Sequence, residues 1–358
     1  LGRLDVPAGE ATEVNLPIEK PELEAGDECF LTLEFSLAGD TRWASAGHRT
    51  AWEQFEMPWQ APESEDVLAD GSLALSSTSD AYTITGDGFE VKVGRQNGLV
   101  ESYSVDGRRL VRAPLRPNFW RAPLDNDRGY NMPELCAEWK KAGRQFRATE
   151  VRVKEVKEGL IALTAMLKHP SAGETTSRLT YRVRGDGSLE VTMKTRPRGE
   201  DLSVLPRVGL QTRVPQGLDS VSWYGRGPWS NYADRRTGAM VGRYEKSVDE
   251  LVYDYVEPQE NGYRTDVRRL TLTDGSGEGL RIVGLPQVGF NVWPYTQQEL
   301  EDARHPYELT RAGALTLNVD AAQMGVGGDT SWGARPHDQY ELHPEGTYTC
   351  SFRMEPVR

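Results

Sequence analysis

Residue pairs that favour tight turns recur along most of this chain, and they constrain its fold more than any other feature. Short strand-like segments are separated by turn sequences of this kind, among them Gly86-Asp87-Gly88, Gln96-Asn97-Gly98, Asp106-Gly107 and Gly185-Asp186-Gly187. Asp-Gly and Asn-Gly pairs supply the positive φ angles that two-residue hairpin turns require. The sequence therefore predicts an all-β chain of antiparallel strands that closes into a large sandwich, with short helices near residues 134–142 and 296–305.

The first sixty or so residues show a separate, smaller β pattern. Apolar and polar residues alternate over 12–16, 29–37 and 49–55, which is typical of short strands with one buried face. The stretch that follows is rich in acidic, Ser and Gly residues and has too little apolar content to form a core. The predicted organisation is a small β-sandwich, a linker and a large β unit, over residues 1–62, 63–79 and 80–358.

Composition excludes several classes of function. The chain of 358 residues has a formal net charge of −12, and its acidic residues are spread along the sequence, which argues against a nucleic-acid partner. Its three cysteines lie far apart and are odd in number, so they indicate neither a disulfide framework nor a Cys-x-x-Cys metal site. The five histidines also lack metal-binding spacing. We therefore expect no metal ion or other cofactor on this chain.

The sequence shows no sign of membrane targeting. No apolar run approaches the roughly 20 residues that a spanning helix needs, and the first residues have neither a basic nor an apolar signal region. We therefore expect no membrane partner and a cytoplasmic location. Because the chain begins at Leu1 and not at Met, we also expect it to be a fragment whose parent could carry a signal that is not visible here.

The run NFWRAPLDND combines aromatic, basic and acidic side chains within ten residues. Arg121 offers a planar fork of five donors, while clustered side-chain oxygens of this kind bind sugar hydroxyls or cap loops. These oxygens belong to Asp125, Asn126 and Asp127. The run is equally consistent with a buried aromatic corner that is held by an Arg–Asp pair. The secondary candidates for a binding site are therefore Arg121, Asp125, Asn126 and Asp127.

A second notable string is MGVGGDTSW, which ends at Trp332. It lacks the lysine of a phosphate-binding loop, and we reject nucleotide binding. Its glycines instead allow a loop to approach another surface closely and to present one large side chain. A tryptophan face packs well on a pyranose ring, although an ordinary core position is also consistent with the sequence. Trp332 is thus the main candidate for substrate binding, with Asp329 and Ser331 as secondary candidates.

Four ordered strings resemble the C-terminal part of the lactose-hydrolysing β-galactosidases of glycoside hydrolase family two: NFWRAPLDND, WYGRGPWSNYADR, YVEPQENGYRTDVR and MGVGGDTSW. The resemblance is best from about residue 80 onward. It extends more weakly over the first sixty residues, which resemble the family's immunoglobulin-like domain. The resemblance implies that the large unit is a supersandwich related to the galactose mutarotases.

The family resemblance also implies what this chain does not carry. The catalytic glutamates of these retaining glycosidases lie on a (β/α)₈ barrel, together with Mg²⁺ and Na⁺, and the barrel has no counterpart here. The resemblance implies that Trp332 forms part of the sugar-binding floor, that Gly129 starts a loop over the active-site mouth, and that the parent is a homo-oligomer. The isolated chain is therefore expected to be inactive.

Three other functions are open at this point. A stand-alone galactoside-binding module is favoured if the aromatic residues of 223–232 are exposed. The chain could also be the small subunit of a two-chain β-galactosidase, or an epimerase-like enzyme, which fold relationship alone suggests. No carboxylate pair is a convincing catalytic pair, because Glu257 with Glu260, and Asp125 with Asp127, are residues that commonly cap turns or pair with arginine.

Overall fold

The computed structural model describes residues 4–61, 71–330 and 332–358. The chain divides into two compact units, Leu1–Val67 and Leu68–Arg358. Both units are built from antiparallel strands, so the all-β prediction is confirmed. None of the helices in the described residues is long and apolar enough to cross a membrane.

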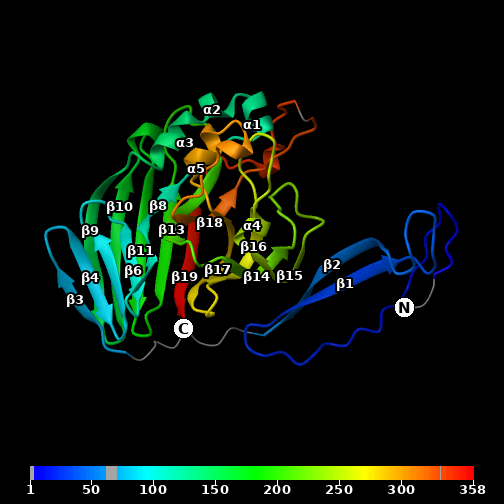
Figure 1. The fold of residues 1–358 in the computed structure, drawn as a ribbon, viewed down its shortest axis with the longest axis horizontal. Helices are drawn as coiled ribbons and strands as arrows, with labels where there is room; N and C mark the ends of the chain where they lie inside the picture. The colour runs from blue at the N-terminus through cyan, green and yellow to red at the C-terminus, as the bar shows by residue number, and fades with distance from the viewer. Residues whose placement is uncertain (1–3, 62–70, 331) are drawn as a thin grey trace. The chain divides into compact units, whose positions relative to one another are not determined.

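The first unit contains one β-ribbon (Figure 1), formed by β1 (Glu28–Ser36) and β2 (Arg49–Gln60). Leu31 lies opposite Phe55, and Phe35, at the other end of β1, is exposed. The strand expected over residues 12–16 does not form, and within 4–61 these two strands do not build a sandwich. The segment before β1 has few large apolar residues between its acidic residues and prolines, so a strand there would bury little surface.

The five-stranded sheet of the second unit follows the turn pattern of the sequence. Its hairpins are joined at Gly88, Gly98 and Gly107, all of which have positive φ. The strands run in the order of the sequence: β3 (Ala74–Ser77), β4 (Ala81–Gly86), β5 (Phe89–Gly94), β6 (Val100–Val105) and β7 (Arg108–Val111). Because β3 pairs with β4, the end of the expected linker belongs to this sheet, while residues 62–70 lie outside the described part.

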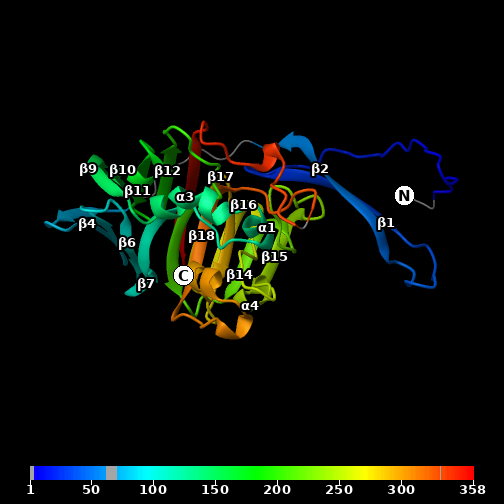
Figure 2. The ribbon, with the colours of Figure 1, turned by 90° about the horizontal axis from the view of Figure 1, so that it is seen from above.

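The larger sheet has 12 strands in the described residues (Figure 2). One row contains β15 (Met240–Ser247), β14 (Ser220–Gly227), β16 (Arg264–Thr273), β17 (Gly279–Trp293), β19 (Tyr348–Val357), β12 (Leu189–Arg196), β11 (Thr176–Arg184), β10 (Leu160–Lys168) and β9 (Arg147–Lys157). A branch from β17 contains β18 (Ala314–Gln323), β13 (Arg207–Pro215) and β8 (Ala113–Asn118). The first half of β17 pairs with β19 and its second half with β18, so this one strand joins the row to the branch.

Short helices gather at one end of these strands (Figure 1): α1 (Asp125–Gly129), α2 (Met132–Leu135), α3 (Ala137–Ala142) and α5 (Gln297–Asp302). A fifth helix, α4 (Val248–Leu251), follows β15. Thr296 caps α5, which lies within the predicted helix 296–305, since its hydroxyl accepts a hydrogen bond from the Glu299 amide. The helix expected over 134–142 is interrupted at Cys136, where α2 ends and α3 begins.

Candidate functional site

Arg121 and Asp127 form a buried corner between the end of β8 and helix α1. The Arg121 Nε and Nη2 atoms donate to the two carboxylate oxygens of Asp127 at 2.9 and 2.8 Å, and neither side chain reaches solvent. Burial alone would lower the pKa of Arg121, but the Asp127 carboxylate holds it above its ordinary value. The Arg121 guanidinium is therefore charged, and its pair with Asp127 fixes the start of α1.

The same arginine holds the base of the glycine-rich loop. Arg121 Nη1 donates to the Met324 carbonyl, and Nη2 donates to the Gly325 carbonyl, each at 2.9 Å. From the other side, Asp234 Oδ2 accepts hydrogen bonds from the amides of Val326 and Gly327 at 2.8 Å. Four consecutive residues of the loop are thus fixed by two charged side chains that come from distant parts of the sequence.

Trp332 lies beyond this anchored base and is 91% exposed. The turn that carries it touches α1, because Gly333 packs backbone to backbone against Gly129. A Cβ atom placed on Gly129 would lie 2.5 Å from the Gly333 Cα atom. The structure therefore places the predicted loop start, Gly129, next to the turn that carries the predicted substrate-binding residue, Trp332.

The remaining candidates occupy different positions around this corner. Asn126 Nδ2 donates to the Val326 carbonyl at 3.4 Å, and Asp329 accepts from the exposed ring of His337 at 2.8 Å. Asp125 is exposed and shares hydrogen bonds with Gln259. Ser331 lies outside the described residues. Asp127 and Arg121 hold the loop in place, whereas Asp125 and Asp329 are accessible at the surface.

The contact between the two glycines gives a first prediction. Replacing Gly129 with alanine should push the Trp332 turn away from α1, because backbone atoms on the other side cannot give way as a flexible side chain would. We expect chymotrypsin to cleave the bond after Trp332 about fivefold faster in this variant, as a loosened turn opens more often. Gly217→Ala is the matched control, since a Cβ atom there meets nothing within 4 Å. Equal cleavage rates in the two variants would contradict the prediction.

A buried charged cluster lies beneath the corner and was not expected from the sequence. Arg207 Nη2 donates to Glu260 Oε1 at 3.0 Å, and its Nε atom lies 3.1 Å from Asp320 Oδ2. Burial raises the pKa of Asp320 to about 7, although Arg207 is beside it. Two carboxyl groups therefore share one guanidinium group, and burial raises the pKa of both. Glu260 accepts the hydrogen bond from Arg207 and is fully buried, so a substrate at the surface cannot reach it.

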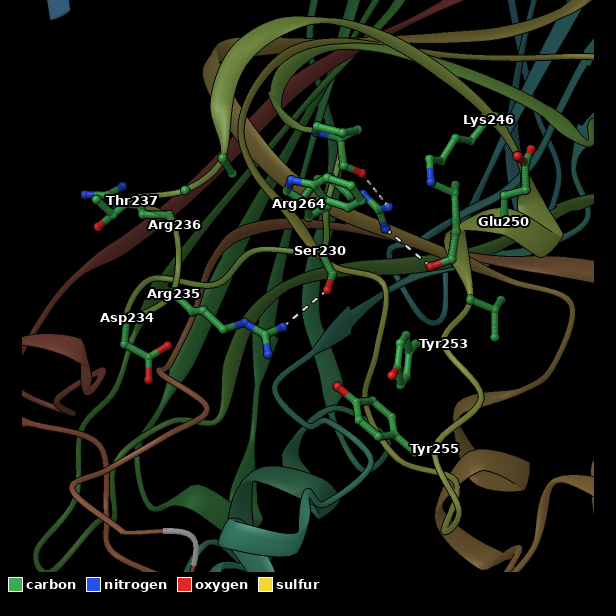
Figure 3. A pocket seen from close by; sticks show the side chains of 16 residues that line it. Ser230, Asp234, Arg235, Arg236, Thr237, Lys246, Glu250, Tyr253, Tyr255 and Arg264 are labelled. Atoms are coloured by element: carbon green, nitrogen blue, oxygen red, sulfur yellow. Dashed lines mark hydrogen bonds between the residues drawn. The ribbon is translucent and has the colours of Figure 1, made fainter. Parts of the chain in front are cut away.

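Next to the anchored loop is a cleft of about 740 Å³ (Figure 3), to which Asp234 also contributes. Tyr253 and Tyr255 lie side by side on one wall, with ring centroids 4.6 Å apart. Trp229 lines the cleft and is 63% exposed, while Trp223, in the same aromatic segment, is buried. The segment 223–232 therefore contributes mainly to packing, with one accessible aromatic side chain.

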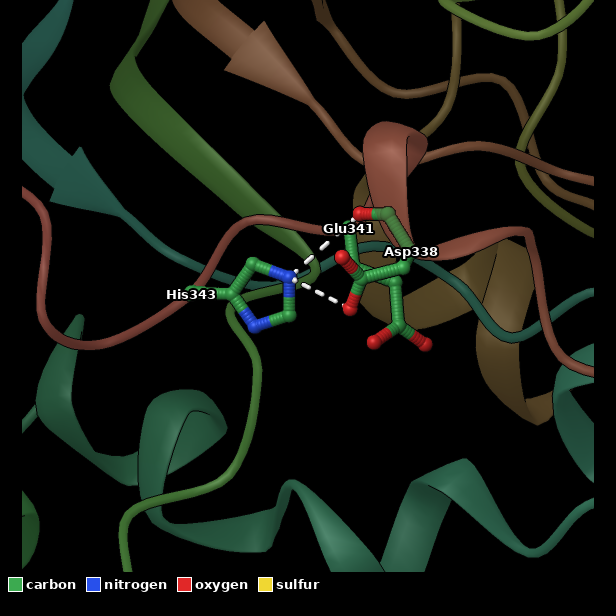
Figure 4. Close-up of side chains that lie close together, drawn as sticks. All are labelled: Asp338, Glu341 and His343. Atoms are coloured by element: carbon green, nitrogen blue, oxygen red, sulfur yellow. Dashed lines mark hydrogen bonds and ion pairs between the residues drawn. The ribbon is translucent and has the colours of Figure 1, made fainter.

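One group of side chains in the described residues has the spacing of metal ligands: Asp338, Glu341 and His343 (Figure 4). Its possible ligand atoms lie within 4.8 Å of one another. Glu341, however, already accepts two hydrogen-bonding contacts from Arg335, at 3.0 and 2.9 Å. His343 and Asp338 are exposed at the surface. The group is a set of local surface ion pairs, and it carries no argument for a metal centre.

The fold is that of an all-β protein with one large antiparallel unit. The anchored loop of this unit exposes Trp332 at the surface. Residues 85–354 match the family described as "Beta galactosidase small chain", and residues 1–58 match "Beta-galactosidase, domain 4". Because the first match covers most of the chain, the chain belongs to the β-galactosidase small-chain family.

Relatives that are named β-galactosidase align with nearly the whole chain. It is 36% identical to the β-galactosidase of Priestia megaterium over 96% of this chain, and 34% identical to that of Halalkalibacterium halodurans over 94%. The chain spans about one third of the length of these relatives, namely 33% and 34%. Among solved structures, the galactose 1-epimerase of Lactobacillus acidophilus NCFM is 11% identical, over 82% of this chain and 100% of that chain, with a TM-score of 0.40. A likeness that loose carries no argument about activity.

Proposed function

We propose that this chain is the C-terminal, non-barrel part of a retaining β-galactosidase that hydrolyses terminal β-D-galactosides such as lactose. In this proposal the catalytic glutamates lie on a barrel domain outside the chain, and so do the Mg²⁺ and Na⁺ ions that the family resemblance implies. The chain supplies Trp332 as a platform for the sugar and the segment after Gly129 as a loop at the active-site mouth. The parent protein is proposed to be a homo-oligomer.

The observation that supports the proposal most strongly is that Trp332 is exposed at the end of an anchored loop. A tryptophan that is 91% exposed has no packing role in its own unit, yet the loop beneath it is held by Arg121 and Asp234. Anchoring of this kind reduces the entropy lost when the side chain meets a partner. The indole face suits the C–H surface of a pyranose ring, and its N–H group can still donate a hydrogen bond.

The surroundings of Glu257 and Glu260 also favour a role for this chain outside catalysis. Retaining hydrolysis requires two carboxyl groups about 5–5.5 Å apart on either side of the scissile bond. Glu260 is buried in the ion pair with Arg207, and Glu257 forms an ion pair with Arg128 at 3.1 Å. Both glutamates are thus already engaged, which supports the placement of the catalytic pair on another domain.

The test compares the isolated chain with the complete polypeptide from which it comes. We expect the purified chain to show no hydrolysis of a chromogenic β-galactoside above a buffer control, whereas the complete polypeptide is active. Removal of residues 80–358 from the complete polypeptide should abolish that activity. Turnover by the isolated chain that persists through repurification would overturn the proposal.

A two-chain arrangement is the second candidate, and the description of the matched family as a small chain favours it. In that arrangement the barrel is a separate polypeptide. Denaturing gel electrophoresis of the native protein distinguishes the two cases. Antibodies against this chain and antibodies against the barrel would detect two separate bands in the two-chain case and one shared band otherwise.

The cleft of Figure 3 supports a third candidate, a galactoside-binding module, because Trp229 and Tyr253 are exposed on its walls. Titration of the isolated chain with galactose tests this function. Binding that is abolished by Trp229→Ala and Tyr253→Ala, but not by Trp332→Ala, would favour the module.

A further inference from the structure

A second cavity, of about 640 Å³, is lined by residues from β8, from the turn after α3, from β13 and from the start of α5. Its volume lies in the range of about 300–1,000 Å³ that is usual for small-molecule sites. Three arginines line it: Arg116, Arg144 and Arg213. Among the residues that the structure describes, no Asp or Glu lines this cavity. It is therefore a positively charged hollow in a chain whose formal net charge is −12.

In the described part of the chain, the hydrogen-bond partners of these three arginines are neutral. Arg116 donates to Gln211 Oε1 at 2.6 Å, and Arg144 donates to Gln298 Oε1 at 2.8 Å. Arg213 donates to the Ala314 carbonyl, while its buried Nε atom has no hydrogen-bond partner. Burial and the like charge of Arg144 both lower the pKa of Arg116. An anion in the cavity would remove this mutual repulsion and satisfy the unpartnered donor.

The position of Arg116 is fixed by the groups behind it. Gln211 Nε2 donates to Gln297 Oε1 at 3.1 Å and to Asn318 Oδ1 at 2.9 Å, which orients its carboxamide oxygen toward Arg116. A guanidinium held in one orientation binds a carboxylate or phosphate through two parallel hydrogen bonds at a small entropic cost. The cavity is thus organised for an oxyanion before any ligand arrives.

The rest of the lining is suited to a ligand that also carries hydroxyl groups. Thr296, Thr316 and Gln298 make part of the lining polar. The Thr296 hydroxyl accepts a hydrogen bond from the Glu299 amide and can still donate its own proton to a sugar hydroxyl. Phe146 and Pro114 add apolar surface that can pack against a ring. We propose that this cavity binds a small anionic carbohydrate, namely a monosaccharide that carries a phosphate or a carboxylate group. This proposal is independent of the proposed hydrolase function.

Calorimetric titration of the purified chain tests the proposal with four probes: galactose 6-phosphate, galacturonate, galactose and inorganic phosphate. We expect at least one of the two anionic sugars to bind at least tenfold more tightly than galactose and than inorganic phosphate. The stronger of the two shows whether the cavity prefers phosphate or carboxylate. Binding should weaken as the salt concentration rises, because the attraction is electrostatic.

Substitutions of the cavity arginines test whether the anionic sugar binds in this cavity. Arg116→Gln and Arg144→Gln should each weaken the binding of the anionic sugar tenfold or more. Arg147→Gln is the matched control, since Arg147 is exposed three residues away and does not line the cavity. Thermal unfolding of each variant verifies that it is folded, and Arg144→Gln, at an exposed position, keeps the test valid if Arg116→Gln fails to fold. The proposal would be overturned if neither anionic sugar bound more tightly than galactose and inorganic phosphate, or if both variants left the binding unchanged.

Discussion

Replacing Trp332 with alanine in the complete polypeptide is expected to raise its KM for a β-galactoside about fivefold to 150-fold. By analogy with aromatic stacking on nucleic-acid bases, one stacking platform contributes about 1–3 kcal/mol, and about 1.4 kcal/mol corresponds to a factor of ten. Trp332 is 91% exposed in its own unit, so its removal should leave folding intact. Steady-state kinetics measures the change in KM, and thermal unfolding of the isolated chain verifies stability.

The control for this substitution is Trp43→Ala, which removes an exposed tryptophan of the first unit. We expect its KM to equal that of the unsubstituted protein. If Trp332→Ala leaves the kinetics unchanged, the proposed platform role is wrong. If it instead lowers the unfolding temperature markedly, Trp332 has a structural role that its exposure does not suggest.

Replacing Arg121 with methionine is expected to reduce the free energy of unfolding of the large unit by about 3–5 kcal/mol, because the buried Asp127 carboxylate loses its partner. The carbonyl groups of Met324 and Gly325 lose their donor in the same variant. Denaturant-induced unfolding of the isolated chain measures the change. The double variant Arg121→Met, Asp127→Leu should recover part of the loss, since it leaves no buried charge unpaired.

Arg128→Met is the matched control for Arg121→Met. Arg128 lies in α1 next to Asp127, but its side chain is 29% exposed and its ion pairs with Asp125 and Glu257 reach the surface. Exposed ion pairs contribute about 0–1 kcal/mol, so this substitution should change stability little. Similar losses in Arg121→Met and Arg128→Met would contradict the special role of the buried pair.

The hairpins of the second unit could be predicted because their determinants are local. Gly88 and Gly107 have the positive φ angles that the Asp-Gly pairs suggested, and each joins two consecutive strands. The first unit shows the limit of the same reasoning. Alternation over residues 12–16 predicts a strand, but a strand also needs a neighbour to complete its hydrogen bonds, and alternation carries no information about that neighbour.

Individual residues of the candidate site could be predicted from the sequence, but the contacts that bring them together could not. Arg121 and Trp332 were identified from composition and from the family resemblance. The contact that Asp234 makes with the amides of Val326 and Gly327 joins segments about 90 residues apart, which no local pattern encodes. The cluster of Arg207 and Asp320 was missed for a related reason, because a single charged residue within a strand is ordinarily on the solvent face.

The packing of Gly129 against Gly333 couples two segments of the protein mechanically. Because neither residue has a side chain, their backbones touch without any intervening group that could rotate and absorb a displacement. A shift at the end of α1 is therefore transmitted directly to the turn that carries Trp332. We therefore expect the position of the exposed indole to depend on a part of the chain about 200 residues earlier.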